Sequence, residues 1–433
     1  LYEIFGLRPL QVVSAILVVR LLSVFLVQTW YVPDEYWQTL EVAHKYTFGY
    51  GALTWEWQKG IRSYLYPAVV AAIYSVLKFT GLDYPEVLLP RILQALISTA
   101  ADYSFYKWTG NRKWALFLIL TSWFWFYTSG RTLLQTLETS LVAIALSIFP
   151  FKNTRIPKWI WLAVLCVFLR PTSAPLWAVL GAYNVITTNQ GRLRLLVRTY
   201  VPIAVIAGGA LVAVDSYFHG SLIVTPWEFF RFNVLHDIAS FYGTHPWHWY
   251  LTQGLPAVLG INLLPVLWAV GTVVRRPKEN HIGFYVYSSF IPHKEFRFVL
   301  PLLPIFLYLA QDVIVPWSRK ATKWQLYAVA GAILVGNAVP ALYFGAVHQA
   351  GALRVMPRLR AALPHNRSSA AFLMPCHSTP LYSHLHMNVS ARYLTCEPPF
   401  ARAAGETYEA EATFYPKNGN DSCRNAGGTA GRC

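Results

Sequence analysis

Long apolar runs recur along almost the whole of this chain, and they constrain its fold more than any other feature. A bilayer crossing needs roughly 17 to 25 predominantly apolar residues. Of the 433 residues, 55% are hydrophobic and 13% are charged, whereas soluble domains usually carry about 25% charged residues. The apolar runs lie at 10–29, 64–79, 114–127, 133–149, 159–186, 200–214, 255–274, 299–315 and 324–347. The sequence therefore predicts an all-α polytopic membrane protein with roughly nine to twelve transmembrane helices.

The basic residues gather in short clusters between the apolar runs, and this distribution explains the net charge of +16. The clusters lie at 107–113, 152–158, 192–198, 275–278 and 319–323. The positive-inside rule places such clusters in cytosolic loops. The same charge on a soluble protein would suggest nucleic-acid binding. Here we expect membrane lipids as the surroundings and no nucleic acid as a partner.

The composition changes after about residue 347, where the apolar runs stop. All three Asn-x-Ser/Thr sequons and four of the five cysteines lie beyond this point: Asn366, Asn388 and Asn420, with Cys376, Cys396, Cys423 and Cys433. Glycan acceptors and cysteines together are typical of an oxidising, glycosylating compartment. We expect a transmembrane catalytic domain over residues 1–346 and a luminal C-terminal tail over 347–433. Four cysteines allow three connectivities, and we favour a Cys376–Cys396 disulfide.

Two polar stretches within the membrane domain, 31–62 and 215–250, have few Lys or Arg and many aromatics, as expected of luminal loops. The first begins with Pro33-Asp34-Glu35, directly after the first apolar run. Proline fits the start of a helix, and acidic residues fit its first turn. A helix from Pro33 would place Asp34, Gln38 and Glu41 on one face. An acid at a helix start can also be an ordinary capping residue, so the position alone does not assign a function.

A second candidate site is Pro292-His293-Lys294-Glu295-Phe296-Arg297-Phe298, immediately before the apolar run 299–315. Ionisable side chains at a membrane boundary are functional candidates because they are costly to keep there. Arg offers a bidentate fork and Lys a point charge, so the cations of this segment suit a phosphate, and Glu295 could orient one of them. The alternative is a cytosolic flank that obeys the charge rule.

Isolated polar residues interrupt two of the apolar runs. Arg131, Gln135 and Glu138 would share one face of a helix, and Arg170 interrupts the run at 159–186. We expect all four to line a polar cavity between spans, although pairs that only hold a helical bundle together are equally common. The chain contains no Walker lysine loop, His-Glu-x-x-His, Cys-x-x-Cys or Gly-x-Ser-x-Gly motif. This absence argues against an ATP-driven pump, a zinc protease and a serine hydrolase.

These strings resemble the dolichyl-phosphate-mannose-dependent mannosyltransferases with a C-type membrane glycosyltransferase fold. The general resemblance rests on Pro33-Asp34-Glu35 and on the segment His293–Phe298. Longer strings at 32–57, 61–67, 226–256 and 373–386 resemble the branch of the family that acts in glycosylphosphatidylinositol (GPI) anchor assembly. The resemblance covers about residues 25–400. It implies transfer of the third, α-1,2-linked mannose from dolichyl phosphate mannose to the two-mannose GPI precursor, on the luminal face of the endoplasmic reticulum (ER) membrane.

The reaction that the resemblance implies assigns roles to the candidate residues. A β-linked donor and an α-linked product mean inversion in a single displacement, which needs one carboxylate to accept the hydroxyl proton. We assign this base to Asp34 and a positioning role to Glu35. The leaving phosphate would be met by His293, Lys294 or Arg297. The acceptor mannoses would stack on four tryptophans: Trp55, Trp57, Trp247 and Trp249. No metal cluster is visible, so we predict no metal and no cofactor apart from the donor substrate.

Two other functions remain open at this point. A sister mannosyltransferase of dolichol-linked oligosaccharide assembly is one, although the strings His-Pro-Trp-His-Trp and Cys-His-Ser-Thr-Pro argue against it. A lipid or sugar transporter is the other. Transporters often show two related halves with broken helices, and the sequence shows no such repeat.

Overall fold

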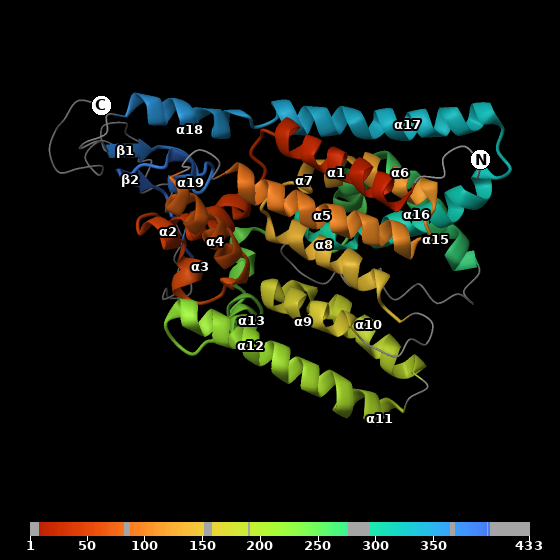
Figure 1. Ribbon diagram of the computed structural model, residues 1–433, viewed down its shortest axis with the longest axis horizontal. Coiled ribbons are helices and arrows are strands. Elements are labelled where there is room, and N and C mark those ends of the chain that lie inside the picture. The colour runs from red at the N-terminus through yellow and green to blue at the C-terminus, as the bar shows by residue number, and fades with distance from the viewer. Residues whose placement is uncertain are drawn as a thin grey trace.

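The computed structural model describes residues 8–81, 87–150, 158–188, 191–275, 294–363, 369–395 and 397–398. The long helices are α1 (Pro9–Leu26), α4 (Leu65–Thr80), α5 (Leu88–Trp108), α8 (Leu134–Ser147), α9 (Trp159–Leu169), α10 (Ala174–Thr187), α12 (Val201–His219), α15 (Leu263–Arg275), α16 (Leu303–Ser318), α17 (Lys323–Leu342) and α18 (Gly351–Ala362). The shorter elements are α2 (Glu41–Phe48), α3 (Trp55–Gln58), α6 (Lys113–Thr121), α7 (Trp123–Thr128), α11 (Arg192–Leu195), α13 (Thr225–Phe230), α14 (Leu255–Leu259), α19 (Tyr382–Leu385), β1 (Ser369–Phe372) and β2 (Ser390–Tyr393). Long helices such as α1, α5, α8 and α17 run roughly along one axis, and the short helices α2, α3 and α19 lie with the two strands at one end (Figure 1).

Five helical segments in the described part of the chain are long and apolar enough to cross a membrane. They are Pro9–Leu26, Arg192–His219, Tyr250–Thr272, Phe296–Ser318 and Lys323–Ala362. Three shorter apolar helices, α4, α8 and α9, lie among them. The prediction of an all-α polytopic membrane protein is therefore confirmed. The expected nine to twelve crossings exceed the five that meet both criteria of length and apolarity, so that count remains a prediction.

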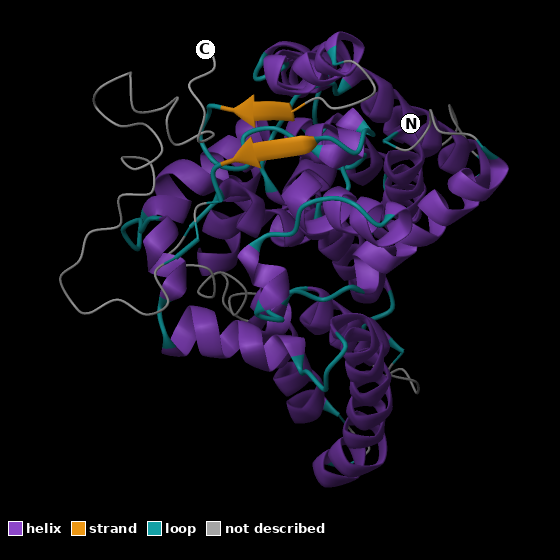
Figure 2. Ribbon diagram, turned by 90° about the vertical axis from the view of Figure 1, so that its left-hand side faces the viewer, coloured by secondary structure: helices purple, strands orange, loops and turns teal. Residues whose placement is uncertain are grey.

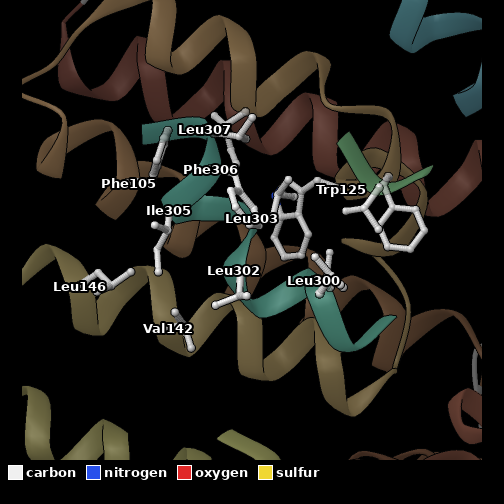
Figure 3. Packing of buried hydrophobic residues seen from close by; sticks show 14 of the residues in the cluster. Phe105, Trp125, Val142, Leu146, Leu300, Leu302, Leu303, Ile305, Phe306 and Leu307 are labelled. Carbon is white, nitrogen blue, oxygen red and sulfur yellow. The ribbon is translucent and has the colours of Figure 1, made fainter. Parts of the chain in front are cut away.

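In the core of the bundle, α8 packs against α5 and against the 3₁₀ turn Phe296–Leu302, and α16, which follows this turn, packs against α15, α6 and α8. Figure 3 shows buried side chains of this core, which come from α5, α7, α8, α16 and the turn before α16. The labelled members of this core are Phe105, Trp125, Val142, Leu146, Leu300, Leu302, Leu303, Ile305, Phe306 and Leu307. Helix association in a membrane depends on such close packing and on interhelical polar contacts, because lipid tails are as apolar as the side chains.

One interhelical polar contact is the buried ion pair between Arg20 of α1 and Asp102 of α5. Arg20 Nε lies 2.6 Å from Asp102 Oδ2, and both side chains are almost completely buried. Trp125 Nε1 donates a hydrogen bond to the other carboxylate oxygen at 2.8 Å. A charge inside a membrane protein needs such a partner. This pair explains how the first span accommodates an arginine.

The segment that follows α1 is helical, but it does not form the single polar face that we expected. Residues Tyr36–Leu40 are π-helical, and a π turn contains an additional residue compared with an α turn. The register therefore shifts between Asp34 and Glu41. Asp34 faces Arg297, Gln38 donates to Glu56, and Glu41 contacts the C-terminal tail.

The tail packs on this first loop at one end of the molecule. Strands β1 and β2 are parallel, with Ser369 opposite Ser390, and α19 lies in the connection between them. The paired strands are visible at the periphery in Figure 2. A second hydrophobic cluster joins the tail to the first loop and α4: Tyr36, Trp37, Leu40, Ala43, Ala52, Val70, Ala71, Tyr74, Leu77, Met356, Phe372, Leu381, Leu385, Met387 and Val389.

Candidate active site around Asp34

Asp34 is held by an arginine that lies 263 positions away in the sequence but close in space. Arg297 Nη1 is 2.7 Å from Asp34 Oδ2. The second terminal nitrogen of Arg297 donates to Glu295 Oε1 at 2.5 Å. The Asp34 side chain keeps 17% of its surface exposed. The structure thus brings the two candidate sequence segments together, and it leaves the Asp34 carboxylate accessible to a substrate.

The neighbouring Glu35 is in a different environment. Arg131 Nη1 donates to Glu35 Oε2 at 2.7 Å, and the two side chains are only 1% and 2% exposed. Arg131 also donates to the carbonyl of Tyr127 and to the hydroxyl of Thr29, and its guanidinium lies 4.3 Å from the Tyr127 ring centroid. Glu35 is therefore part of a closed, fully paired network that ties the first loop to the bundle. This environment fits the positioning role assigned to Glu35.

Arg131 was expected on a helix face together with Gln135 and Glu138, and the structure corrects this expectation. Arg131 precedes α8, which begins at Leu134, so it is free to turn toward Glu35. Glu138 lies on α8 and faces Arg170, with 3.6 Å between Oε2 and Nε. Gln135 is buried, and its Oε1 has no hydrogen-bond partner among the described residues. Three of the four residues expected to line one cavity thus belong to two separate buried ion pairs, and Gln135 belongs to neither.

Lys294 is buried beside the loop that precedes the span Tyr250–Thr272. Its Nζ donates to the carbonyl of His245 at 3.1 Å and lies 6.0 Å from the ring centroid of Tyr250. His293 lies outside the described residues, so its role stays a prediction. The segment 294–297 therefore links the second polar loop to Asp34.

The four tryptophans proposed for acceptor binding divide into two groups. Trp55 and Trp57 are 6% and 2% exposed, and their indole N–H groups already donate to Tyr242 and to the carbonyl of Trp37. Trp247 is 68% exposed, and Trp249 stacks on His245 with 4.8 Å between ring centroids. A sugar needs an accessible ring face, so Trp247 suits the stacking role better than the two buried rings.

A contact that sequence reasoning missed attaches the tail to the first loop. The buried Glu41 carboxylate accepts four hydrogen bonds from residues 381–383: the backbone N–H groups of Leu381, Tyr382 and Ser383, and the Ser383 hydroxyl, at 2.6 to 3.1 Å. Burial raises the pKa of Glu41, and these four donors oppose that rise. No local sequence signal could have revealed the contact, because the partners are about 340 positions apart.

The tail also reaches the neighbourhood of Asp34 through His377. Its ring packs edge-on against Trp37 with 4.6 Å between ring centroids, and Trp37 Nε1 donates to the carbonyl of Thr379. Burial lowers the pKa of His377 to about 4, although the nearby Asp34 carboxylate opposes this shift. His377 is therefore neutral near neutral pH.

The remaining tail predictions are only partly within the described residues. Asn388 is exposed, as a glycan acceptor requires, and lies two positions before β2. Asn366, Asn420 and Cys396 lie outside the described residues. Cys376 is disulfide-bonded, and its pairing with Cys396 stays a prediction. The described residues contain no group of three or more His, Cys, Asp or Glu that could hold a metal ion, and the expected independence from metals stays a prediction as well.

The fold has a counterpart among solved structures. ArnT from Cupriavidus metallidurans bound to undecaprenyl phosphate superimposes with a TM-score of 0.60 at 14% identity, covering 88% of this chain and 85% of that one. Its apo structure gives a TM-score of 0.57. At this identity the likeness concerns the fold alone, which is that of a membrane glycosyltransferase.

Sequence relatives are closer. "GPI mannosyltransferase 3" of Drosophila melanogaster is 49% identical over 426 residues, which cover 94% of this chain and 75% of the relative. "GPI alpha-1,2-mannosyltransferase 3" is 41% identical in Danio rerio, over 95% of this chain and 78% of the relative. The protein of that name in Homo sapiens is 37% identical, over 92% of this chain and 74% of the relative. The sequence model of the Alg9-like mannosyltransferase family matches residues 11–386. This chain therefore belongs to the Alg9-like mannosyltransferase family.

Proposed function

We propose that this protein transfers the third mannose, in α-1,2 linkage, from dolichyl phosphate mannose to the two-mannose GPI precursor on the luminal face of the ER membrane. The names of its relatives support the anchor precursor as the acceptor and the α-1,2 linkage. The polyprenyl phosphate bound by the similarly folded ArnT supports a lipid-linked donor. The observation that carries the proposal is the accessible carboxylate of Asp34, held by Arg297 where the two candidate segments meet.

The chemistry needs one base, and Asp34 suits this task better than Glu35. A base must be reached by the acceptor hydroxyl, and Asp34 keeps 17% of its side chain exposed against 2% for Glu35. In the proposed reaction the acceptor hydroxyl oxygen attacks C1 of the donor mannose, and Asp34 takes the hydroxyl proton. The bond between C1 and the phosphate oxygen breaks, and its electron pair leaves with dolichyl phosphate. Attack opposite the leaving group inverts the configuration at C1.

Different segments of the chain offer binding groups for the donor phosphate and for the acceptor sugars. Lys294, held by the His245 carbonyl, offers a positive charge three positions before Arg297 in the same segment. The exposed Trp247, two positions after His245, offers a ring face for an acceptor mannose. Both belong to the polar region that we assign to the lumen. No metal or cofactor takes part in the proposed mechanism.

Reconstitution tests the proposal. Purified protein in lipid nanodiscs is given dolichyl phosphate mannose and the two-mannose GPI glycolipid, and the product is analysed by mass spectrometry before and after α-1,2-mannosidase digestion. We expect a three-mannose product whose terminal mannose the mannosidase removes. Transfer to a dolichol-linked oligosaccharide instead of the GPI glycolipid would identify the sister activity. Movement of substrate across a bilayer without any new glycosidic bond would indicate a transporter.

A further inference from the structure

Arg297 was expected to bind the donor phosphate, but each of its terminal nitrogens lies at ion-pair distance from a carboxylate. Nη1 forms an ion pair with Asp34 at 2.7 Å that is not aligned as a hydrogen bond, and Nη2 donates to Glu295 at 2.5 Å. Nε of Arg297 has no hydrogen-bond partner among the described residues. Bidentate recognition of a phosphate uses two parallel N–H groups of one guanidinium. Arg297 would have to release one carboxylate before it could bind a phosphate in this way. Its geometry suits a residue that holds the base.

Arg170, at the turn between α9 and α10, is in the opposite situation. Its side chain is 7% exposed, and its ion pair with Glu138, Nε to Oε2, is 3.6 Å long, beyond ordinary hydrogen-bond length. Its Nη1 is buried and has no hydrogen-bond partner in the described part of the chain. A buried donor left without a partner is destabilising, so such donors in native structures call for an explanation. A ligand with acceptor oxygens supplies one.

Phe298 connects the guanidinium of Arg170 to the residue that holds the base. The guanidinium carbon of Arg170 lies 5.2 Å from the Phe298 ring centroid, and that of Arg297 lies 5.5 Å from the same centroid. Both distances are within the range of cation–π attraction. One ring therefore contacts both arginines, and Arg297 in turn contacts Asp34. Asp34 is thus connected to Arg170 through the side chains of Arg297 and Phe298.

We propose that Arg170 is the guanidinium that binds the phosphate of the lipid-linked donor, and that Arg297 positions Asp34. This inference rests on the proposed function. The donor phosphodiester carries one negative charge, and the dolichyl phosphate that leaves carries a second one as the bond to C1 breaks. A guanidinium with an unfilled N–H stabilises the charge where it develops. Arg170 is then the phosphate-binding residue, while Asp34 and Arg297 form the proton-accepting site.

The test separates lipid binding from turnover. The parent protein, Arg170→Gln, Arg170→Lys and Arg297→Gln are purified into nanodiscs, and equilibrium binding of radiolabelled dolichyl phosphate is measured beside transfer kinetics. Arg170→Gln should bind dolichyl phosphate about ten- to a hundredfold more weakly, as expected for the loss of a charge-assisted contact. Arg170→Lys keeps the charge without the fork, so its loss should be smaller. Arg297→Gln should lower kcat while dolichyl phosphate binding and the donor KM stay at parental values, and Arg297→Lys should partly restore kcat.

Arg112→Gln is the control for losing an arginine, because Arg112 pairs with Asp312 with 42% of its side chain exposed, and we expect it to match the parent. If Arg170→Gln aggregates, Arg170→Lys provides the comparison, since its ammonium still faces Glu138. The inference is contradicted if the Arg170 variants bind dolichyl phosphate as tightly as the parent does. It is also contradicted if Arg297→Gln is the variant that loses binding while the Arg170 variants keep it. A parent protein that binds dolichyl phosphate but does not mannosylate the GPI glycolipid contradicts the proposed function instead, and the binding comparison still tests Arg170.

Discussion

Replacing Asp34 by Asn and Glu35 by Gln should separate catalysis from stability at two adjacent positions. The Asp34→Asn amide is nearly isosteric but cannot accept the hydroxyl proton. The expected loss is about 10²–10⁴-fold in the rate of transfer, or about 2.7–5.5 kcal/mol of activation free energy. The free energy of unfolding should fall by only about 1 kcal/mol, because the amide oxygen still accepts from Arg297. Arg297 also retains Glu295 as a charged partner.

Glu35→Gln should lower the stability of the protein more than its rate of transfer. Glu35 and Arg131 are both almost fully buried, and removing the charge of one partner leaves an uncompensated buried cation. Such losses cost about 3–5 kcal/mol, and we expect the lower end because the Gln oxygen can still accept from Arg131. Against a typical stability of about 5–15 kcal/mol, this loss should reduce the amount of folded protein. Transfer per folded molecule should stay within about tenfold of the parent, since no proton acceptor is lost.

The assay pairs single-turnover transfer in nanodiscs with thermal unfolding followed by tryptophan fluorescence. Rates are normalised to folded protein, so that a stability defect is not counted as a catalytic one. Asp34→Asn should unfold near the parental midpoint and be almost inactive, whereas Glu35→Gln should unfold earlier and remain active. An active Asp34→Asn together with an inactive but stable Glu35→Gln would refute our assignment and move the base by one residue. Normal transfer by both variants would mean that the loop is structural.

Three further predictions concern the tail and the bundle. Glu41→Gln should release the tail, since hydrogen bonds to a charged group contribute about 1.5–3 kcal/mol, and limited proteolysis of the tail should report this. Burial, together with the neighbouring His386, lowers the pKa of His44 to about 4, below the usual value near 6.5. The unfolded state therefore binds more protons between pH 6.5 and 4, so tail protection should be complete above pH 6.5 and decline toward pH 4. Asp102→Asn should lower the unfolding midpoint in detergent by leaving Arg20 buried without a countercharge; an unchanged midpoint would show that the pair is dispensable.

The sequence alone determined the class of fold and where the chemistry had to be sought. Apolar runs of bilayer length leave few alternatives to a helical bundle, because lipid offers no hydrogen bonds to an unpaired backbone. The first run coincides with α1, and both polar segments chosen as site candidates contribute to the contacts around Asp34. The specific strings also led to the family. These features depend on local composition and order, which a sequence states directly.

Only the tertiary structure decided how the charged residues are paired. Asp34 and Glu35 are adjacent and chemically similar, yet one remains accessible beside Arg297 and the other is enclosed with Arg131. The π-helical turn after them moves Glu41 away from the expected face and toward the tail. Helical periodicity could not predict either outcome, because each depends on which distant segment packs against the loop. A buried charge takes the partner that packing brings within about 3 Å, and sequence separation does not enter that choice.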